Sequence, residues 1–444
     1  MSDVILVGLV LVLTTALILL RMPVGIALGL GGGFGLLMLR DASHVLRTIA
    51  STSFTQTHTF TLTIIPMFIL MGIFAVHSGI AKDVFAVASR LFGKLPGGLA
   101  IATVMACAAF AAVSGSSIGT AATMSRLSVR EMARAGYPLQ VASATVAVAG
   151  TLGAMIPPSL FLVVYAIISG ESVGAMLAAG IIPGILSAIA YAIYLFFRMR
   201  KVTLTPSSPG MGDALESATN AKGPLPWGGV VKVGILFAII MGGIYSGLFT
   251  ATESAAIGAV AALIMLVVSK LREGARAIGN GITESFKEAA STTSMVFLVI
   301  LGSGILSAFF VLAGVPDMLA DAVLGMNMPG WLTMAMLLAV LIPMGMVLES
   351  MSMLVIAVPL IYPVAEQLGF NGILLGVLMV KLIEIGMVTP PVGINCYVVA
   401  GTSGVKATTV FKGIWPFVAV ELLICVLLFV FPALSLALPA LIRN

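Results

Sequence analysis

Long apolar stretches recur along the whole sequence, and they constrain its fold more than any other feature. A helix needs about 20 apolar residues to cross the hydrocarbon core of a bilayer. Only 9% of the 444 residues are charged, against roughly 25% in a soluble domain, so most of the surface must face lipid. We therefore predict an all-α, multi-pass membrane protein. The predicted spans are residues 4–20, 22–39, 61–79, 139–168, 174–197, 230–249, 253–269, 291–313, 372–400 and 413–438.

Two further apolar stretches, 97–125 and 329–363, are interrupted in the middle by small and polar residues. The interruptions are Ser114-Gly115-Ser116-Ser117 and Glu349-Ser350-Met351-Ser352. Such a pattern is typical of a helical hairpin that enters and leaves the membrane on the same side. The first apolar run, 4–20, lacks a basic segment before it and a small-residue cleavage site after it, which favours a membrane helix over a signal peptide.

The two halves of the chain are related by a constant offset of 233 positions. Residues 1–197 form the first predicted repeat, 198–229 a polar linker, and 230–444 the second repeat. Most residues that match at this offset are glycine or proline, which fix backbone geometry. The matching pairs include Pro96 and Pro329, Gly97 and Gly330, Gly136 and Gly369, Gly153 and Gly386, Pro157 and Pro390, Pro158 and Pro391, Gly180 and Gly413, and Pro183 and Pro416.

The distribution of lysine and arginine predicts how the repeats are oriented. Cytoplasmic loops of membrane proteins are enriched in these residues. Placing the linker in the cytoplasm leaves only Arg40, Arg47 and Arg443 of the 22 outside, and Lys381 within the membrane. The hairpin at 97–125 then faces the cytoplasm and the hairpin at 329–363 faces the periplasm. The repeats are therefore predicted to be inverted, which is the plan of many secondary transporters.

Each repeat also carries a Pro-Pro pair near the middle of an apolar run. These pairs lie in the stretches 139–168 and 372–400. Proline ends a helix, and irregular backbone within a membrane survives only beside protein or a water-filled cavity. Freed carbonyls can then bind Na⁺, and a half-helix N-terminus favours a carboxylate. The alternative is that both pairs are simple kinks and that the hairpin serines only make helix contacts.

Lys381 and Glu384 are charged residues inside the second broken stretch. A charge at this depth usually faces a cavity or a partner. One hypothesis is that Lys381 pairs with Glu384 or Glu349, where its ammonium would tune an ion site or replace a cation. The other is a purely structural or snorkelling ion pair. Glu253, which follows a turn, is interpreted as part of a helix N-cap.

The same sequence bears on other classes of function. Residues 115–119 fit the pattern G-x-S-x-G, but an intramembrane serine hydrolase would need a preceding strand and a histidine, and no histidine follows His77. No metal-ligand cluster and no P-loop is present, so neither an organic cofactor nor ATP hydrolysis is expected. The basic residues lie in short loops, which argues against nucleic-acid binding. A passive channel remains an alternative.

The sequence resembles the large membrane subunit of TRAP transporters, the tripartite ATP-independent periplasmic carriers. The likeness covers nearly the whole chain. The motifs that carry it are Ile65 to Gly72, Ser114 to Ser117, Gly153 to Ser159, Gly247 to Glu253, Pro359 to Pro363 and Glu384 to Gly393. Ala251 departs from the family pattern Thr-Pro-Thr-Glu in the turn before Glu253.

The resemblance implies an elevator mechanism in the bacterial inner membrane, with uptake of small carboxylates driven by sodium. It also implies two partners, a periplasmic binding protein and a small four-helix membrane subunit; a stand-alone anion carrier is the alternative. The implied Na⁺ ligands are Ser114, Gly115, Ser116, Ser117, Ile156, Pro157, Pro158, Glu349, Ser350, Ser352, Thr389, Pro390, Pro391 and Gly393. The expected substrate contacts are Ser117, Ser159, Asn395 and Lys381.

Overall fold

The computed structural model describes residues 3–200, 202, 225–315, 318 and 328–441. Every regular element in these ranges is a helix, as predicted for an all-α membrane protein. Seven of the described helices are long and apolar enough to cross a bilayer, or eight if the bent pair Leu139–Met155 and Leu160–Ser169 counts as one span. Most of the predicted linker, 198–229, lies outside the described residues.

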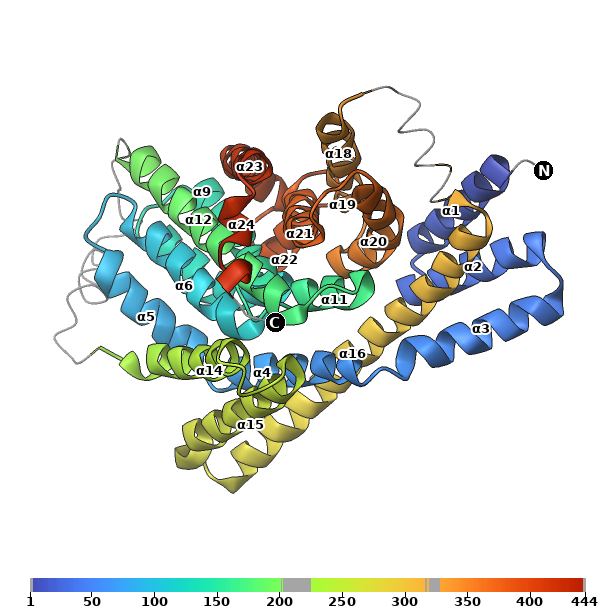
Figure 1. Cartoon of the computed structure of the whole chain (residues 1–444). Coiled ribbons are helices and arrows are strands. Elements are labelled where there is room, and N and C mark those ends of the chain that lie inside the picture. Colours follow the sequence, from blue (N-terminus) through green and yellow to red (C-terminus); the bar gives the residue numbers. More distant parts are fainter. Residues whose placement is uncertain (1–2, 201, 203–224, 316–317, 319–327, 442–444) are drawn as a thin grey trace.

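The first repeat begins with three outer helices and continues into a packed bundle (Figure 1). Its hairpin consists of α6 and α7, which pack against each other, and its interrupted span consists of α9, α10 and α11. The elements are α1 Asp3–Leu19, α2 Val24–Leu39, α3 Ala42–Thr57, α4 Ile64–His77, α5 Ile80–Phe92, α6 Gly98–Ser114, α7 Ser117–Met124, α8 Arg130–Arg134, α9 Leu139–Gly150, α10 Leu152–Met155, α11 Leu160–Ser169 and α12 Val173–Met199.

The second repeat contains the same kinds of element in the same order. Its hairpin is formed by α18 and α19 on one arm and α20 on the other, and α21 and α22 form its interrupted span. The elements are α14 Trp227–Tyr245, α15 Ala251–Lys270, α16 Ala275–Leu312, α18 Gly330–Ala339, α19 Leu341–Gly345, α20 Ser350–Gln367, α21 Gly372–Val388, α22 Ile394–Ser403, α23 Ala407–Val430 and α24 Ala433–Leu436.

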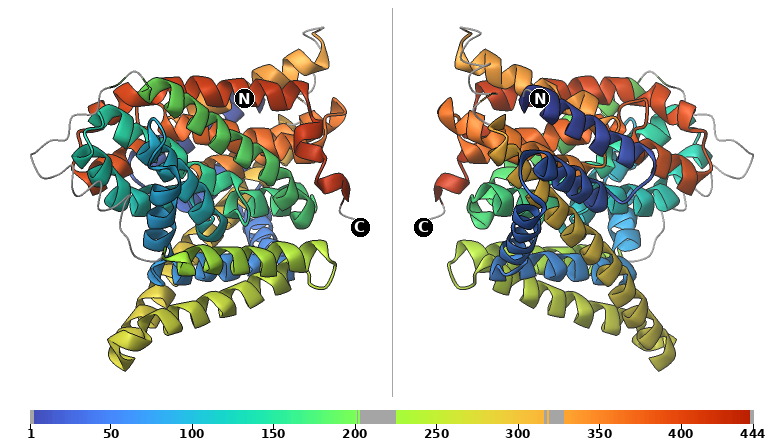
Figure 2. Two further views of the ribbon diagram at one scale, coloured as in Figure 1. Left: turned by 90° about the vertical axis from the view of Figure 1, so that its left-hand side faces the viewer. Right: turned by 90° about the vertical axis from the view of Figure 1, so that its right-hand side faces the viewer.

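Helix α16 crosses the molecule as one long rod of 38 residues, about 57 Å at 1.5 Å per residue (Figure 1). It packs most extensively against α2, and also against α3, α4 and α20. The contact with α2 is a backbone contact, because a Cβ added at Gly302 would lie 2.0 Å from the carbonyl oxygen of Gly25. Figure 2 shows α14 and α15 as an outer layer below the bundle that holds both hairpins.

The turn before α15 confirms the prediction for Glu253. Thr250 caps the helix by accepting a hydrogen bond from the Glu253 backbone N–H, at 3.2 Å. The Glu253 carboxylate in turn accepts from the Thr250 backbone N–H, at 2.8 Å. This reciprocal pair is a capping box, and it satisfies helix donors that lack an intrahelical partner.

Candidate functional site

The tip of the first hairpin is a two-residue turn between α6 and α7. Gly115 ends α6 in the left-handed region, with φ of 58°, a conformation that glycine adopts without strain. Ser116 is extended and caps α7, because its Oγ accepts a hydrogen bond from the Gly119 N–H at 3.2 Å. Ser117, the first residue of α7, is fully buried and directed into the protein.

The first interrupted span lies directly against this tip. The helix ends at Met155 and resumes at Leu160, where Ser159 caps α11 and donates a 2.5 Å hydrogen bond back to the Ala154 carbonyl across the break. Backbones touch here: a Cβ added at Gly115 would lie 2.7 Å from the Pro158 carbonyl oxygen. The predicted sodium ligands at 114–117 and at 156–158 are thus neighbours in space. The hydroxyl of Ser159, by contrast, donates its hydrogen bond to the Ala154 carbonyl.

The second hairpin and the second interrupted span form a comparable arrangement. Glu349 caps α20 by accepting hydrogen bonds of 3.1 Å from both the N–H and the hydroxyl of Ser352. The chain after α21 returns to this tip, since the Val392 N–H donates to the Met346 carbonyl at 3.3 Å. Thr389, Pro390 and Pro391 lie in that return, and the left-handed Gly393 precedes α22. Thr389 Oγ1 donates to the Ile385 carbonyl at 2.6 Å.

Asn395 is fully buried in the first turn of α22, and neither its Oδ1 nor its Nδ2 has a hydrogen-bond partner. Buried amides are almost always paired with protein, water or a ligand. An unpaired amide beside the second break therefore fits a group that becomes satisfied when something binds. This is the position that the sequence predicts for a substrate contact.

The two hairpin tips meet at Glu384 on α21. The Ser117 hydroxyl donates to Glu384 Oε1 at 3.2 Å, and the Ser350 hydroxyl donates to the same oxygen at 2.9 Å. Ser350 is the first residue of α20, just as Ser117 is the first of α7. Glu384 is only 5% exposed, so a single buried carboxylate connects the return helices of both repeats.

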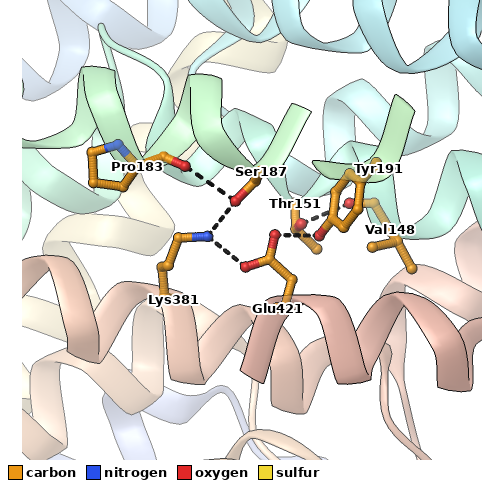
Figure 3. A network of polar contacts seen from close by, with 7 residues as sticks. All are labelled: Val148, Thr151, Pro183, Ser187, Tyr191, Lys381 and Glu421. Carbon is orange, nitrogen blue, oxygen red and sulfur yellow. Dashed lines mark hydrogen bonds and ion pairs between the residues drawn. The ribbon is translucent and has the colours of Figure 1, made fainter. Parts of the chain in front are cut away.

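Lys381 does not pair with Glu384 or Glu349, and that hypothesis is wrong. Its ammonium donates to Glu421 Oε2 on α23 at 2.5 Å and to Ser187 Oγ on α12 at 2.6 Å (Figure 3). Tyr191 of α12 donates to the other oxygen of Glu421. The side chain of Lys381 leaves α21 toward these two helices because they supply both a countercharge and a hydroxyl. A structural role for the pair stays a prediction.

A cavity of about 150 Å³ lies beside the first tip. One wall is formed by the tip and the first break, through Ser114, Ser116 and Pro158. The opposite wall comes from α4 and α16, and it includes Phe68 and Glu288. The cavity therefore lies at the boundary between the tip of the first hairpin and helices α4 and α16.

Sequence reasoning missed three members of the Lys381 network. Glu421 lies in the apolar stretch 413–438, and the rule that a charge in a membrane span needs a partner would have found it. Ser187 and Tyr191 carry no such signal, because hydroxyl-bearing residues are common in membrane helices. The sequence also offered no sign that Ser117 and Ser350 share one acceptor.

Inverted repeats with interrupted spans and paired hairpins define a secondary transporter, a class that moves solutes without hydrolysing ATP. The model of the family described as "Tripartite ATP-independent periplasmic transporter, DctM component" matches residues 11–434. The chain belongs to this family, so the resemblance inferred from the sequence is confirmed. It is a multi-pass protein of the inner membrane and a transporter, not an enzyme.

Several characterised relatives cover nearly the whole chain. The large permease protein DctM of the C4-dicarboxylate TRAP transporter of Pseudomonas aeruginosa is 34% identical over 93% of both chains. Its counterpart from Rhodobacter capsulatus is 32% identical over 100% of both. The large permease protein SiaM of the sialic acid TRAP transporter of Vibrio cholerae is 30% identical over 93% of this chain and 95% of its own.

Two solved transporters share the fold at low sequence identity. The YdaH transporter of Alcanivorax borkumensis superposes with a TM-score of 0.62 at 16% identity, covering 89% of this chain and 90% of its own. MtrF of Neisseria gonorrhoeae gives the same TM-score at 15% identity, over 88% of this chain and 85% of its own. At this identity the likeness concerns the architecture alone.

Proposed function

We propose that this protein takes up a small organic anion, with a carboxylate as the recognised group, and that a sodium gradient drives the uptake. The observation that carries the proposal is the contact of each hairpin tip with an interrupted span. Each such contact gathers backbone carbonyls and hydroxyls, which are hard oxygen ligands of the kind that sodium prefers.

The chemistry of the predicted ligands fits sodium better than a transition metal. No group of three His, Cys, Asp or Glu side chains that could hold a metal ion occurs in the described part of the chain. The ligands at 114–117 with 156–158 would form one ion site. Those at Glu349, Ser350 and Ser352 with 389–393 would form the other, with Asn395 beside it for the substrate.

The anionic substrate is supported by what related transporters are named for. Relatives are named for C4-dicarboxylates, for sialic acid and for 2,3-diketo-L-gulonate, all of which carry a carboxylate. Another relative, the permease DctMQ of Oleidesulfovibrio alaskensis, is named for isethionate, a sulfonate. The shared feature is one compact anionic head group, which the N-terminus of a half-helix can stabilise.

Movement of the bundle against the outer helices would complete the cycle. Both hairpins and both interrupted spans would travel together as an elevator past a scaffold that includes α4, α15 and α16. Membership of the family also supports two partners, a periplasmic binding protein that delivers the substrate and a small four-helix membrane subunit that braces the scaffold. A stand-alone ion-coupled anion carrier is the second candidate, and it would need neither partner.

Uptake in proteoliposomes tests the proposal. Purified protein would be reconstituted with the proposed small membrane subunit, and radiolabelled dicarboxylates, keto acids and sugar acids would be offered with and without the proposed binding protein. Accumulation that requires an inward sodium gradient and the binding protein would support a sodium-driven transporter that works with both partners. Accumulation without the binding protein would favour the stand-alone carrier, and downhill flux that ignores sodium would contradict sodium coupling.

A further inference from the structure

Glu384 occupies a special position relative to the two repeats. Ser117 and Ser350, which both donate to its Oε1, are separated by the same 233 positions that relate the repeats. They are therefore equivalent residues, each at the start of the returning helix of its own hairpin. Two equivalent hydroxyls from opposite repeats converge on a single oxygen atom.

The residue equivalent to Glu384 in the first repeat is Thr151. Its hydroxyl donates to the Val148 carbonyl of its own helix at 2.6 Å and contacts neither tip serine. Both residues line one small cavity, whose other walls include Leu152 and its equivalent Ile385. Repeat-equivalent residues thus face each other across this cavity, and only one of the two central positions carries a carboxylate.

Within the described ranges, no lysine, arginine or histidine forms an ion pair with Glu384. Lys381, one helical turn away, is committed to Glu421 and Ser187. Glu384 Oε2 is buried and has no hydrogen-bond partner. The two serine hydroxyls are therefore the only hydrogen-bond partners of this carboxyl group among the described residues, and losing either one would leave a buried polar group less well satisfied.

We propose that Glu384 is the positioning residue that couples the two sodium sites to each other. The inference rests on the proposed sodium-driven function. A hydroxyl has one proton and two lone pairs. Because Ser117 and Ser350 each donate their hydroxyl hydrogen bond to Glu384, the lone pairs of their oxygens would be left to face a cation at each tip. Hydrogen bonds in a connected network also polarise both hydroxyls, which makes their oxygens better ligands.

Coupling follows because the acceptor is shared. Sodium at one tip fixes that serine and so fixes the carboxylate for the other serine. When sodium leaves one tip and that tip moves, Glu384 loses one of its two hydrogen-bond donors. The carboxyl group then holds the serine of the other tip less firmly. Such coupling is reciprocal by thermodynamic necessity. It predicts that the two sites fill together, and that a tip with no ion destabilises binding at the other.

Equilibrium binding of ²²Na⁺ to the full chain in lipid nanodiscs tests this proposal. Wild-type protein is expected to bind with a Hill coefficient clearly above 1. Glu384→Gln is expected to bring the coefficient to about 1 and to raise the half-saturating sodium concentration about tenfold, within the 5–150-fold range typical of coupled sites. Ser350→Ala removes one of the two hydrogen bonds to Glu384 and is also expected to lose cooperativity. Because Ser350 is itself a proposed Na⁺ ligand, this variant is decisive in one direction: cooperativity that persists in it overturns the coupling role even if Glu384→Gln does not fold.

Tyr362→Phe is the matched control. Its hydroxyl donates to Glu171 at 2.9 Å and so also bridges the two repeats, but away from the hairpin tips. This variant is expected to keep both the Hill coefficient and the half-saturating concentration. An effect as large as that of Glu384→Gln would mean that any inter-repeat contact suffices, and would overturn the specific role of Glu384.

Failure of the inference can be told apart from failure of the proposed function. Cooperative binding that persists in both Glu384→Gln and Ser350→Ala would overturn the coupling role while sodium-driven uptake stands. A Hill coefficient of 1 for wild-type protein would likewise overturn the coupling role and leave the sodium-driven function standing. Wild-type protein that binds no sodium at all would instead overturn the sodium-driven function, and the inference with it.

Discussion

Replacing Lys381 by methionine is expected to destabilise the protein strongly. Lys381 and Glu421 are 5% and 6% exposed, so the substitution leaves a buried carboxylate with Tyr191 as its remaining donor. Removing one member of a buried ion pair costs about 3–5 kcal/mol. We expect a loss of that size in the free energy of unfolding, measured by titrating the purified protein from mixed micelles with SDS and following helicity by circular dichroism.

The double variant Lys381→Met/Glu421→Gln separates two contributions to the loss of stability: the uncompensated charge of Glu421 and the changed packing of the side chains. The glutamine keeps an acceptor for Tyr191 and removes the uncompensated charge, so most of the loss should be recovered, leaving about 1 kcal/mol. Lys412→Met, at an exposed position of α23, is the control and should stay within about 0.5 kcal/mol of wild type. The single variant Glu421→Gln is measured beside them. A cost below about 1 kcal/mol for Lys381→Met would refute the reasoning, and so would a double variant whose cost equals the sum of the costs of Lys381→Met and Glu421→Gln.

Three further substitutions test other parts of the structure. Gly115→Ala places a Cβ 2.7 Å from the Pro158 carbonyl oxygen at a positive φ, and it should lower uptake in proteoliposomes more than tenfold. Normal uptake would show that transport does not require the close backbone contact between Gly115 and Pro158. Thr250→Val removes the capping box and should cost about 1 kcal/mol in unfolding experiments without changing uptake, whereas no cost would argue against the cap. Gly302→Ala drives a Cβ into Gly25 and should cost about 1–3 kcal/mol or more; an unchanged midpoint of thermal unfolding would show that α2 and α16 separate easily.

The fold class could be predicted because membrane insertion imposes length and polarity on each span. Apolar stretches of the required length identify helices directly, and two prolines in sequence mark a place where a helix cannot continue. Helix α3 was not predicted, because its sequence is rich in serine and threonine and a search for apolar stretches passes over it. The first half of α16 was missed because charged residues such as Arg276, Glu284 and Lys287 interrupt its apolar pattern.

The candidate site was predicted less completely than the fold. Serines, carboxylates and Pro-Pro pairs can be recognised one by one, but their contacts depend on how two repeats pack. Lys381 shows the difficulty: Glu384 is three residues away on the same helix, and yet the partner is Glu421, 40 positions further along the chain. Local spacing favoured the wrong acid because it ignores the neighbouring helices, which decide where a long side chain can reach.

The single carboxylate between the repeats has a consequence for how such a protein can originate. A half-length polypeptide that paired with an inverted copy of itself would place identical residues at both central positions. Two threonines would offer the tip serines no charged acceptor, and two glutamates would set like charges against each other in a dry interior. Joining two copies in one gene lets Thr151 and Glu384 differ, so neither half can be exchanged for a second copy of the other.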